Sequence, residues 1–362
     1  MELRKATLAI GLYLIAYTLI GNPSTIYISI LWILFGLLVS LNIPEIRKNY
    51  ITKRILDVYK SLLPKISKTE QEAIDAGNVW WDAELFTGNP NWDVLRSNPK
   101  AELPPEEQAF IDGPVNELCE MIDEWQVAHK DYDLPKEVYD FVKEKGFFSF
   151  IIPKEYGGLD FSPLGLIYVM AKIGSRSGTL ASMVGVPNSL GPAELLMHYG
   201  TEEQKKDLLP KLASGEHVPC FALTGPYAGS DATSMPDTGV VCKGEFGGKE
   251  IIGIKLNFSK RYITLAPIAT LIGLAFKMHD PDHLIGEVDD YGITCALLPR
   301  ELEGLESGRR HIPIGSPFMN GTITGEDVFI PLDYIIGGVE RAGEGWKMLT
   351  DCLSAGRAVV LP

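Results

Sequence analysis

The feature that most constrains this 362-residue chain is a run without a charged side chain, from Ala6 to Ile43. One helical crossing of a bilayer needs about 20 residues, so the run is too long for a single crossing. It is interrupted at Gly21-Asn22-Pro23-Ser24, a turn-forming cluster at which one helix ends and another begins. The sequence therefore predicts a hydrophobic membrane hairpin in residues 1–45, with helices over Ala6–Ile20 and Thr25–Asn42.

Basic residues on both sides of this hairpin predict its orientation. Because positive residues stay on the cytoplasmic side of a membrane, both ends are expected in the cytoplasm. The first helix is short for a full crossing, so a re-entrant or interfacial hairpin stays open. No small-residue cleavage site follows the first apolar run, which disfavours a signal peptide. The basic residues are Arg4 and Lys5 before the hairpin, and Arg47, Lys48, Lys53 and Arg54 after it.

The hydrophobic period divides the rest of the chain into four parts, which together predict an α+β protein. Residues 46–104 are predicted to be a juxtamembrane linker that carries Trp80, Trp81 and Trp92, and residues 105–218 a helical domain. Residues 219–336 are predicted to be a compact β domain, a barrel or a sandwich. Residues 337–362 are expected to begin a C-terminal helical bundle that is cut short, because the sequence is expected to leave the apolar face of this helix without a partner.

Local signals place several element boundaries. Asp133, with Pro135 in the first turn, predicts a helix start, and Thr201 with Gln204 forms a capping-box pattern. Gly247-Gly248 predicts a two-residue hairpin between two strands.

Composition excludes some classes of function. The formal charge of −14 disfavours a nucleic-acid partner, which needs a basic face. The five cysteines are scattered without CxxC pairs, which indicates reduced thiols. No GxGxxG, P-loop, GxSxG or HExxH motif occurs, so a nicotinamide-binding Rossmann domain is not expected. His279 and His283 are spaced like metal ligands, but Pro281 between them breaks the helical face, and no metal site is predicted.

Two segments could bind a ligand. In Cys220–Ser234, "CFALTGPYAGSDATS", an apolar strand runs into a loop whose backbone N–H groups could approach an anion closely. In Lys260–Thr264, "KRYIT", alternation along a strand puts an aromatic ring and a hydroxyl on one face, where they could pack against a flat ring. Each segment also fits an ordinary turn or an ordinary cross-strand pair.

In their order along the chain, these segments resemble the acyl-CoA dehydrogenase family. The resemblance covers roughly residues 105–362 and also includes "IIPKEYGGLDFS" and "DVFIPLDYIIGGVERAGEGW". The apolar hairpin and "AIDAGNVWWDAELF" are similar to the large bacterial, membrane-associated acyl-CoA dehydrogenases of fatty-acid β-oxidation. The resemblance implies an N-terminal helical domain, a middle β-barrel domain and a C-terminal bundle around FAD and an acyl-CoA thioester.

The same resemblance implies site residues, position by position. Ser230 would contact both the flavin and the substrate, Thr264 would lie near the flavin N5 edge, and Arg357 would contact the CoA part. The residues implied for the flavin are Phe221, Leu223, Thr224, Gly229, Ser230, Tyr262, Ile263 and Thr264.

The implied reaction is α,β-dehydrogenation of an acyl-CoA to a trans-2-enoyl-CoA. The membrane hairpin favours substrates with long, hydrophobic acyl chains. Electrons would pass to an electron-transferring flavoprotein. The implied location is the bacterial inner membrane, with the soluble domains in the cytoplasm. A homo-oligomer is one arrangement left open.

This sequence departs from the family pattern at three places. Gly225 replaces the usual glutamate of Thr-Glu-Pro, and Tyr262 replaces the more frequent tryptophan. The family's catalytic glutamate is expected beyond Pro362, so no catalytic residue is named. Two alternatives stay open. The first is a membrane-anchored protein that binds flavin or acyl-CoA without catalysis, or that forms half of an enzyme together with a partner chain. The second is an acyl-CoA oxidase of the same fold.

Overall fold

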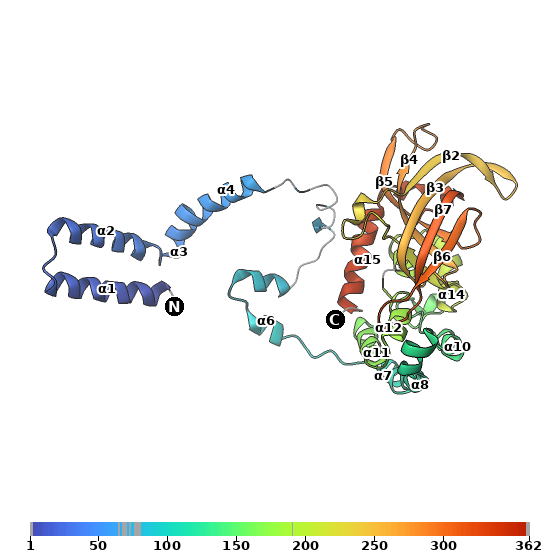
Figure 1. The fold of residues 1–362 in the computed structure, drawn as a ribbon, viewed down its shortest axis with the longest axis horizontal. Helices are drawn as coiled ribbons and strands as arrows, with labels where there is room; N and C mark the ends of the chain where they lie inside the picture. Colours follow the sequence, from blue (N-terminus) through green and yellow to red (C-terminus); the bar gives the residue numbers. More distant parts are fainter. Residues whose placement is uncertain are drawn as a thin grey trace. The chain divides into compact units, whose positions relative to one another are not determined.

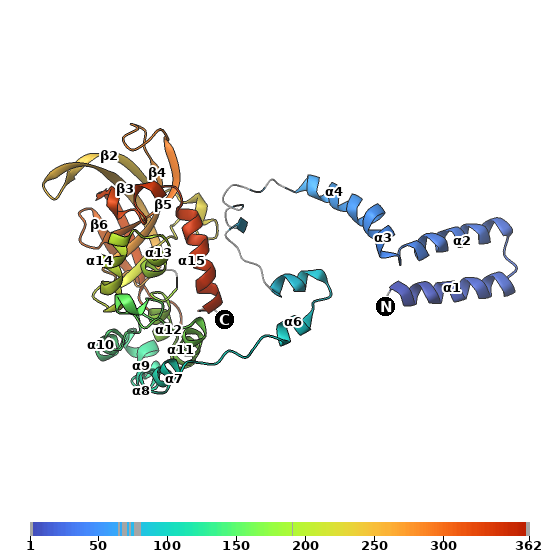
Figure 2. The same ribbon diagram turned by 180° about the vertical axis from the view of Figure 1, so that it is seen from behind.

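The computed structural model describes residues 3–63, 66, 71, 74–75, 81–189 and 191–359, with side chains as far as Leu353. Trp80 therefore lies outside the described residues, as does the side chain of Arg357. The chain forms two compact units, Met1–Ser67 and Lys68–Pro362, each of which is described by itself. Figures 1 and 2 show the elements of both units from opposite sides.

The first unit begins with the expected helical hairpin. Its helices are α1 (Leu3–Ile20) and α2 (Thr25–Ser40). They pack closely because Gly11 carries no side chain: a Cβ there would lie 2.8 Å from the Phe35 ring. Near the open end of the hairpin, Asn42 Nδ2 donates to Thr7 Oγ1 at 2.9 Å. After the hairpin come α3 (Pro44–Ile46), η1 (Arg47–Thr52) and α4 (Lys53–Leu62).

Of the helices in the described part of the chain, α1 alone is long and apolar enough to cross a membrane by itself. The helix α2 meets the same test only together with residues 44–62.

The second unit begins with the short elements η2 (Trp81–Thr87) and α6 (Trp92–Arg96), whose indole rings at Trp81 and Trp92 lie 4.9 Å apart. A helical layer follows. Its helices are α7 (Pro105–Asp112), α8 (Pro114–Glu120), α9 (Glu124–Gln126), η3 (Val127–Asp131), α10 (Lys136–Glu144), η4 (Lys154–Tyr156), α11 (Pro163–Arg176), α12 (Gly178–Gly185), α13 (Pro192–Tyr199) and α14 (Glu202–Ala213).

Two of the local boundary signals have different outcomes. The capping box at the start of α14 is confirmed, since the Thr201 hydroxyl accepts from Gln204 N while Gln204 Oε1 accepts from Thr201 N. The helix start at Asp133 is wrong. Pro135 precedes α10, and Asp133 Oδ1 instead accepts from Leu134 N and from the Tyr139 hydroxyl. Because the Asp133 carboxylate accepts from these two donors, it does not cap the backbone N–H groups at the start of α10.

A seven-stranded sheet forms the other layer, in the order β1-β4-β2-β3-β7-β6, with β5 on the second edge of β4. The pairs β1–β4 and β2–β4 are parallel, and the remaining pairs are antiparallel. The strands are β1 (Pro219–Ala222), β2 (Thr238–Phe246), β3 (Lys249–Thr264), β4 (Leu271–His279), β5 (Asp290–Pro299), β6 (Leu305–His311) and β7 (Asn320–Pro331).

The predicted turn between β2 and β3 is confirmed. Gly247 and Gly248 both have positive φ, at 60° and 76°, which a two-residue hairpin turn of this kind requires. Short 3₁₀ turns complete the connections: η5 (Ala232–Ser234), η6 (Leu332–Tyr334) and η7 (Val339–Arg341).

The last element, α15 (Gly345–Val359), corrects one expectation. Its apolar face was expected to lack a partner in this chain. Instead, Met348, Leu349 and Cys352 are buried in a cluster with residues of α13 and β5, among them Leu195 and Cys295. In Figures 1 and 2, α15 runs alongside the sheet, while α7, α8, α10, α11 and α12 gather below it. Its first turns therefore belong to the core of the second unit.

Candidate functional site

The first part of the candidate site is the loop that leaves β1. The strand is buried throughout, and the Phe221 ring fills the space beside Gly273 on β4, where a Cβ would clash with it. The loop then turns back on itself, because Gly225 N donates to Ala228 O at 3.1 Å. Further on, Gly229 and Ser230 are exposed, and nothing lies within 4 Å of a Cβ built on Gly229. Open backbone of this kind can approach a ligand closely.

The second part is an irregularity in β3. Between Lys260 and Ile263, β3 has one residue more than its partner β7, which defines a β-bulge. Tyr262 has a φ of +59°, and its side chain is 57% exposed, whereas Lys260 is fully buried. The bulge interrupts the alternation between Lys260 and Tyr262, whereas Tyr262 and Thr264 are both more exposed than the buried Ile263 between them.

Hydrogen bonds join the loop to the bulge. Arg261 N donates to Thr224 O at 3.0 Å, and the Arg261 guanidinium donates to Pro226 O at 3.1 Å. Gly225 lies so close to β3 that a Cβ on it would be 3.1 Å from Ser259 O. A glycine at this position suits this close approach. The structure thus brings together the two segments that the sequence singled out separately.

A buried ion pair between Lys260 and Asp237 stabilises the contact between the β1 loop and the β3 bulge. Lys260 Nζ lies 2.5 Å from Asp237 Oδ2 and donates to Leu223 O at 3.0 Å, while Asp237 Oδ1 accepts from Ser259 N at 2.8 Å. Both side chains are almost entirely buried. Burial lowers the pKa of Lys260, and the Asp237 carboxylate opposes that effect. Each charged group is thus hydrogen-bonded to the other and to the backbone of the loop or of β3, as a buried pair requires.

The third part is a hollow of about 610 Å³ beside the bulge. The register of the sheet places Asn320 of β7 between Thr264 of β3 and His311 of β6. The Tyr262 and His311 rings lie 5.0 Å apart, and the Arg261 guanidinium lies 4.9 Å from the centre of the Tyr262 ring. The hollow is lined by Tyr262, Arg309, Arg310, His311, Ile312, Pro313 and Asn320.

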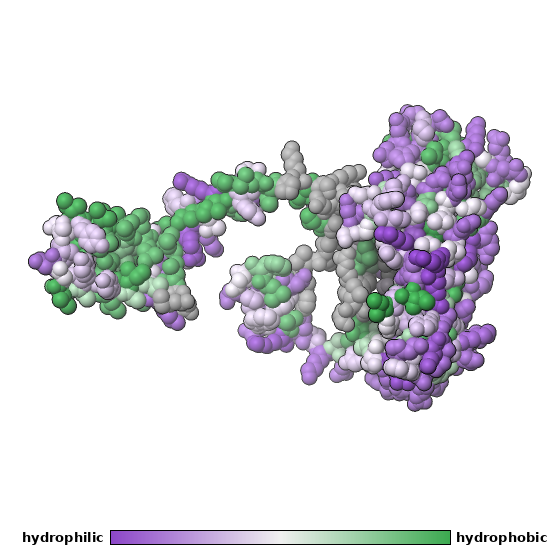
Figure 3. Space-filling model, viewed as in Figure 1, coloured by the Kyte–Doolittle hydropathy of each residue, from purple (hydrophilic) through white to green (hydrophobic). Residues whose placement is uncertain are grey.

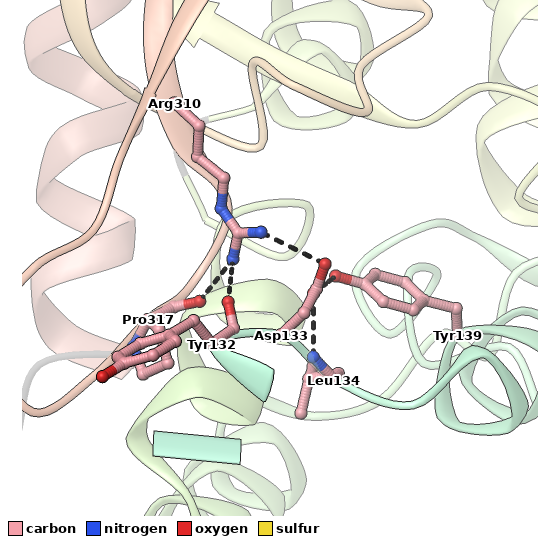
Figure 4. A network of polar contacts seen from close by, with 6 residues as sticks. All are labelled: Tyr132, Asp133, Leu134, Tyr139, Arg310 and Pro317. Carbon is pink, nitrogen blue, oxygen red and sulfur yellow. Dashed lines mark hydrogen bonds and ion pairs between the residues drawn. The ribbon is translucent and has the colours of Figure 1, made fainter. Parts of the chain in front are cut away.

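Arg310 connects this hollow to the helical layer (Figure 4). Its guanidinium forms an ion pair with Asp133 at 3.1 Å and donates to the carbonyl oxygens of Tyr132 and Pro317 at 2.6 and 2.8 Å. The Tyr139 hydroxyl donates to the same carboxylate, and burial, followed by the Asp133 charge, raises the pKa of Tyr139. The wall of the hollow is therefore held by contacts from two layers.

The arrangement is suited to an anionic ligand. The Nε atoms of Arg261 and Arg310 are buried, and within the described part of the chain neither has a hydrogen-bond partner. Arg309 is exposed at the same hollow. Cationic groups of this kind around an aromatic ring can bind a group that combines phosphate with a flat ring system.

The structure assembles seven of the predicted site residues around the loop and the bulge: Phe221, Leu223, Thr224, Gly229, Tyr262, Ile263 and Thr264. Ser230 lies at the exposed end of the same loop. Arg357 lies in α15, and its side chain is outside the described residues. Sequence reasoning missed Asp237, Lys260, Arg261 and Arg310. A lysine in the middle of a strand was the one available signal, because it needs a buried partner if it faces the core.

No group of three or more His, Cys, Asp and Glu side chains that could hold a metal ion occurs among the described residues. His279, the last residue of β4, lies 3.6 Å from Asp290, the first residue of β5. His283, in the connection between these strands, lies 3.1 Å from Asp289.

Comparison with known proteins agrees with this fold. Residues 106–216 match the family described as "Acyl-CoA dehydrogenase, N-terminal domain". An acyl-CoA dehydrogenase of Bacillus subtilis is 27% identical over 236 residues, which cover 64% of this chain and 57% of that protein. Protein HemX of Proteus mirabilis is 54% identical over 88 residues, which cover 24% of this chain and 52% of that protein. The chain spans about half the length of these curated relatives.

A solved structure supports the same assignment. The acyl-CoA dehydrogenase of Bacillus anthracis complexed with FAD is similar with a TM-score of 0.53 at 23% identity, covering 70% of this chain and 39% of that one. This likeness concerns the fold. Residues 106–216 thus form an acyl-CoA dehydrogenase N-terminal domain, and the described part of the second unit has the fold of the acyl-CoA dehydrogenases.

Proposed function

We propose that this chain is part of an FAD-dependent acyl-CoA dehydrogenase that oxidises long-chain acyl-CoA in fatty-acid β-oxidation. The observation that carries the proposal is the junction of the β1 loop with the β3 bulge, through Arg261 N and Thr224 O. That junction combines an exposed aromatic ring, hydroxyl groups and an open glycine loop with the buried Arg261 Nε, which has no hydrogen-bond partner among the described residues. A bound FAD would supply the acceptor for the β hydride of the acyl thioester, while a base would take the α proton.

The residues of this chain have distinct proposed tasks. Ser230 and the N–H groups near Gly229 bind phosphate oxygens, since hydroxyls and open backbone donate to anions. Tyr262 packs against a flat ring, and the Thr264 hydroxyl hydrogen-bonds its edge. Phe221, Leu223, Thr224 and Ile263 line the same ring, and Arg357 contacts the CoA part. No residue of the chain is assigned as the base.

Partners and location follow from the same proposal. Electrons pass to an electron-transferring flavoprotein. The hairpin α1–α2 attaches the protein to the bacterial inner membrane, with the second unit in the cytoplasm. The apolar composition of the hairpin and the basic residues on both sides of it support this attachment.

The proposal is tested on the native protein, purified in detergent from membranes of its source, with its intact mass compared with the 39.9 kDa of this chain. We expect bound flavin, seen by its absorbance, which bleaches when a long-chain acyl-CoA is added without oxygen. Ser230→Ala and Thr264→Val should each weaken flavin binding or slow bleaching, equivalent to about 1–3 kcal/mol. Thr264→Ser keeps the hydroxyl and serves as the control.

Other outcomes separate the alternatives. Flavin that is bound but never bleached by acyl-CoA would favour a non-catalytic binding protein or half an enzyme. Rapid reoxidation in air with release of hydrogen peroxide would favour an oxidase. Normal binding and reduction in both variants would remove the site assignment.

A further inference from the structure

The direction of the chain changes sharply where it leaves the hairpin. Within the first unit, α2 (Thr25–Ser40) and the helical segment Pro44–Leu62 meet at an angle of 87°. If α2 stands across a bilayer, a segment at nearly a right angle to it runs along the bilayer surface. We propose that α4 (Lys53–Leu62) lies in the interface of the membrane and binds anionic phospholipid there. This inference rests on the proposed attachment through the hairpin and adds a second contact to it.

The side chains of α4 are arranged for such a position. At 100° per residue, Ile55, Val58, Tyr59 and Leu62 fall on one side of the helix, and the charged residues fall on the other. The apolar side is fully available, because Ile55 is 64%, Val58 63% and Leu62 76% exposed. In Figure 3, apolar residues make a continuous green run along this arm of the first unit. An exposed apolar stripe of this length is costly in water and marks a surface that binds something apolar.

Charge identifies the partner. Although the whole chain carries a formal charge of −14, the segment from Pro44 to Leu62 is net positive, with only Glu45 and Asp57 as acidic residues. Its basic residues are Arg47, Lys48, Lys53, Arg54 and Lys60. Helices with a basic polar face and an apolar opposite face lie in the headgroup region, and basic residues near the surface favour anionic lipids. The acidic excess of the chain lies in the second unit, so binding of α4 by that unit in place of lipid is an outcome to be tested.

The test uses the full chain reconstituted into phosphatidylcholine vesicles with and without phosphatidylglycerol. Amide hydrogen exchange is followed separately in peptides from the hairpin and from residues 53–62. We expect the hairpin to be protected in both kinds of vesicle. Residues 53–62 should exchange about tenfold more slowly when phosphatidylglycerol is present.

Two variants make the comparison specific. Val58→Asp puts a charge on the apolar side of α4, and Ser61→Asp puts the same charge on the polar side. The added protection of residues 53–62 should be lost in Val58→Asp and kept in Ser61→Asp, with the hairpin unchanged in both.

The remaining results overturn the inference in distinguishable ways. A protected hairpin with residues 53–62 exchanging equally fast in both vesicles would leave the attachment standing and reject the interfacial helix. Protection of residues 53–62 that ignores both lipid composition and Val58→Asp would mean that α4 is covered by protein. Rapid exchange in the hairpin itself would reject the attachment.

Discussion

At the scale of single residues, the most consequential pair is Lys260 and Asp237, which are buried under the candidate site and fix its loop. Removing one partner of a buried ion pair leaves an uncompensated charge, at a cost of about 3–5 kcal/mol. We therefore expect Lys260→Met to lower the unfolding free energy by about this amount, measured by denaturant or thermal unfolding of the chain in detergent. Adding Asp237→Asn to that variant should restore part of the loss.

The same strand offers a matched control. Lys255 also belongs to β3 but is exposed, so Lys255→Met should change stability by less than about 0.5 kcal/mol. Similar losses in the two lysine variants would contradict the assignment of the ion pair as the support of the loop.

At the scale of elements, Gln204 joins the first turn of α14 to the chain after β7. Besides its bond with Thr201, its amide donates to Asp333 O at 2.9 Å and Ile335 O at 2.7 Å and accepts from Gly337 N at 3.0 Å. Thr201→Ala removes one cap, which costs about 0.5–2 kcal/mol. Gln204→Ala should cost more, because it removes the partner of the Asp333 carbonyl and of the Thr201 and Gly337 N–H groups. The Ile335 carbonyl still accepts from Gly338 N.

Thermal unfolding of the two variants checks this order. Gln108→Ala is the control, since that side chain bonds only to the exposed Asp112 within the described contacts. A Gln204→Ala variant as stable as Gln108→Ala would show that water replaces these bonds without loss.

The elements also show what sequence reasoning reaches. The α1–α2 hairpin, the glycine turn after β2 and the capping box of α14 were predictable, because each depends on residues that are neighbours in the chain. The bulge at Tyr262 and the partners of α15 were not. They depend on β7, α13 and β5, which come close only in the folded chain. For the same reason the loop and the strand of the candidate site could be named separately, whereas their junction could not.

At the scale of the whole second unit, Arg310 links the sheet to the helical layer. Arg310→Gln removes the ion pair with Asp133 and weakens the bonds to the backbone of Tyr132 and Pro317. The pair is partly exposed, so we expect a loss of only about 1–2 kcal/mol. Amide exchange should become faster in the segment around Asp133 and in β6.

Arg309→Gln removes the same charge from the neighbouring, exposed position and should leave that exchange unchanged. Equal acceleration in both variants would mean that net charge, and not the contact shown in Figure 4, holds the two layers together.

The way in which β1 and β2 share one edge of β4 affects how the ligand specificity of the candidate site could evolve. A single edge of β4 is divided between β1, at Leu271–Leu274, and β2, at Lys277–His279. The loop of residues 223–237 thus leaves and rejoins the sheet along one strand, and Lys277 N holds its far end by donating to Asp237 O. Both ends of the loop are anchored on the same strand. Insertions or replacements between these two ends can alter what is bound without shifting any strand pairing. The loop of residues 223–237 is therefore a natural place to change specificity by mutation or by design.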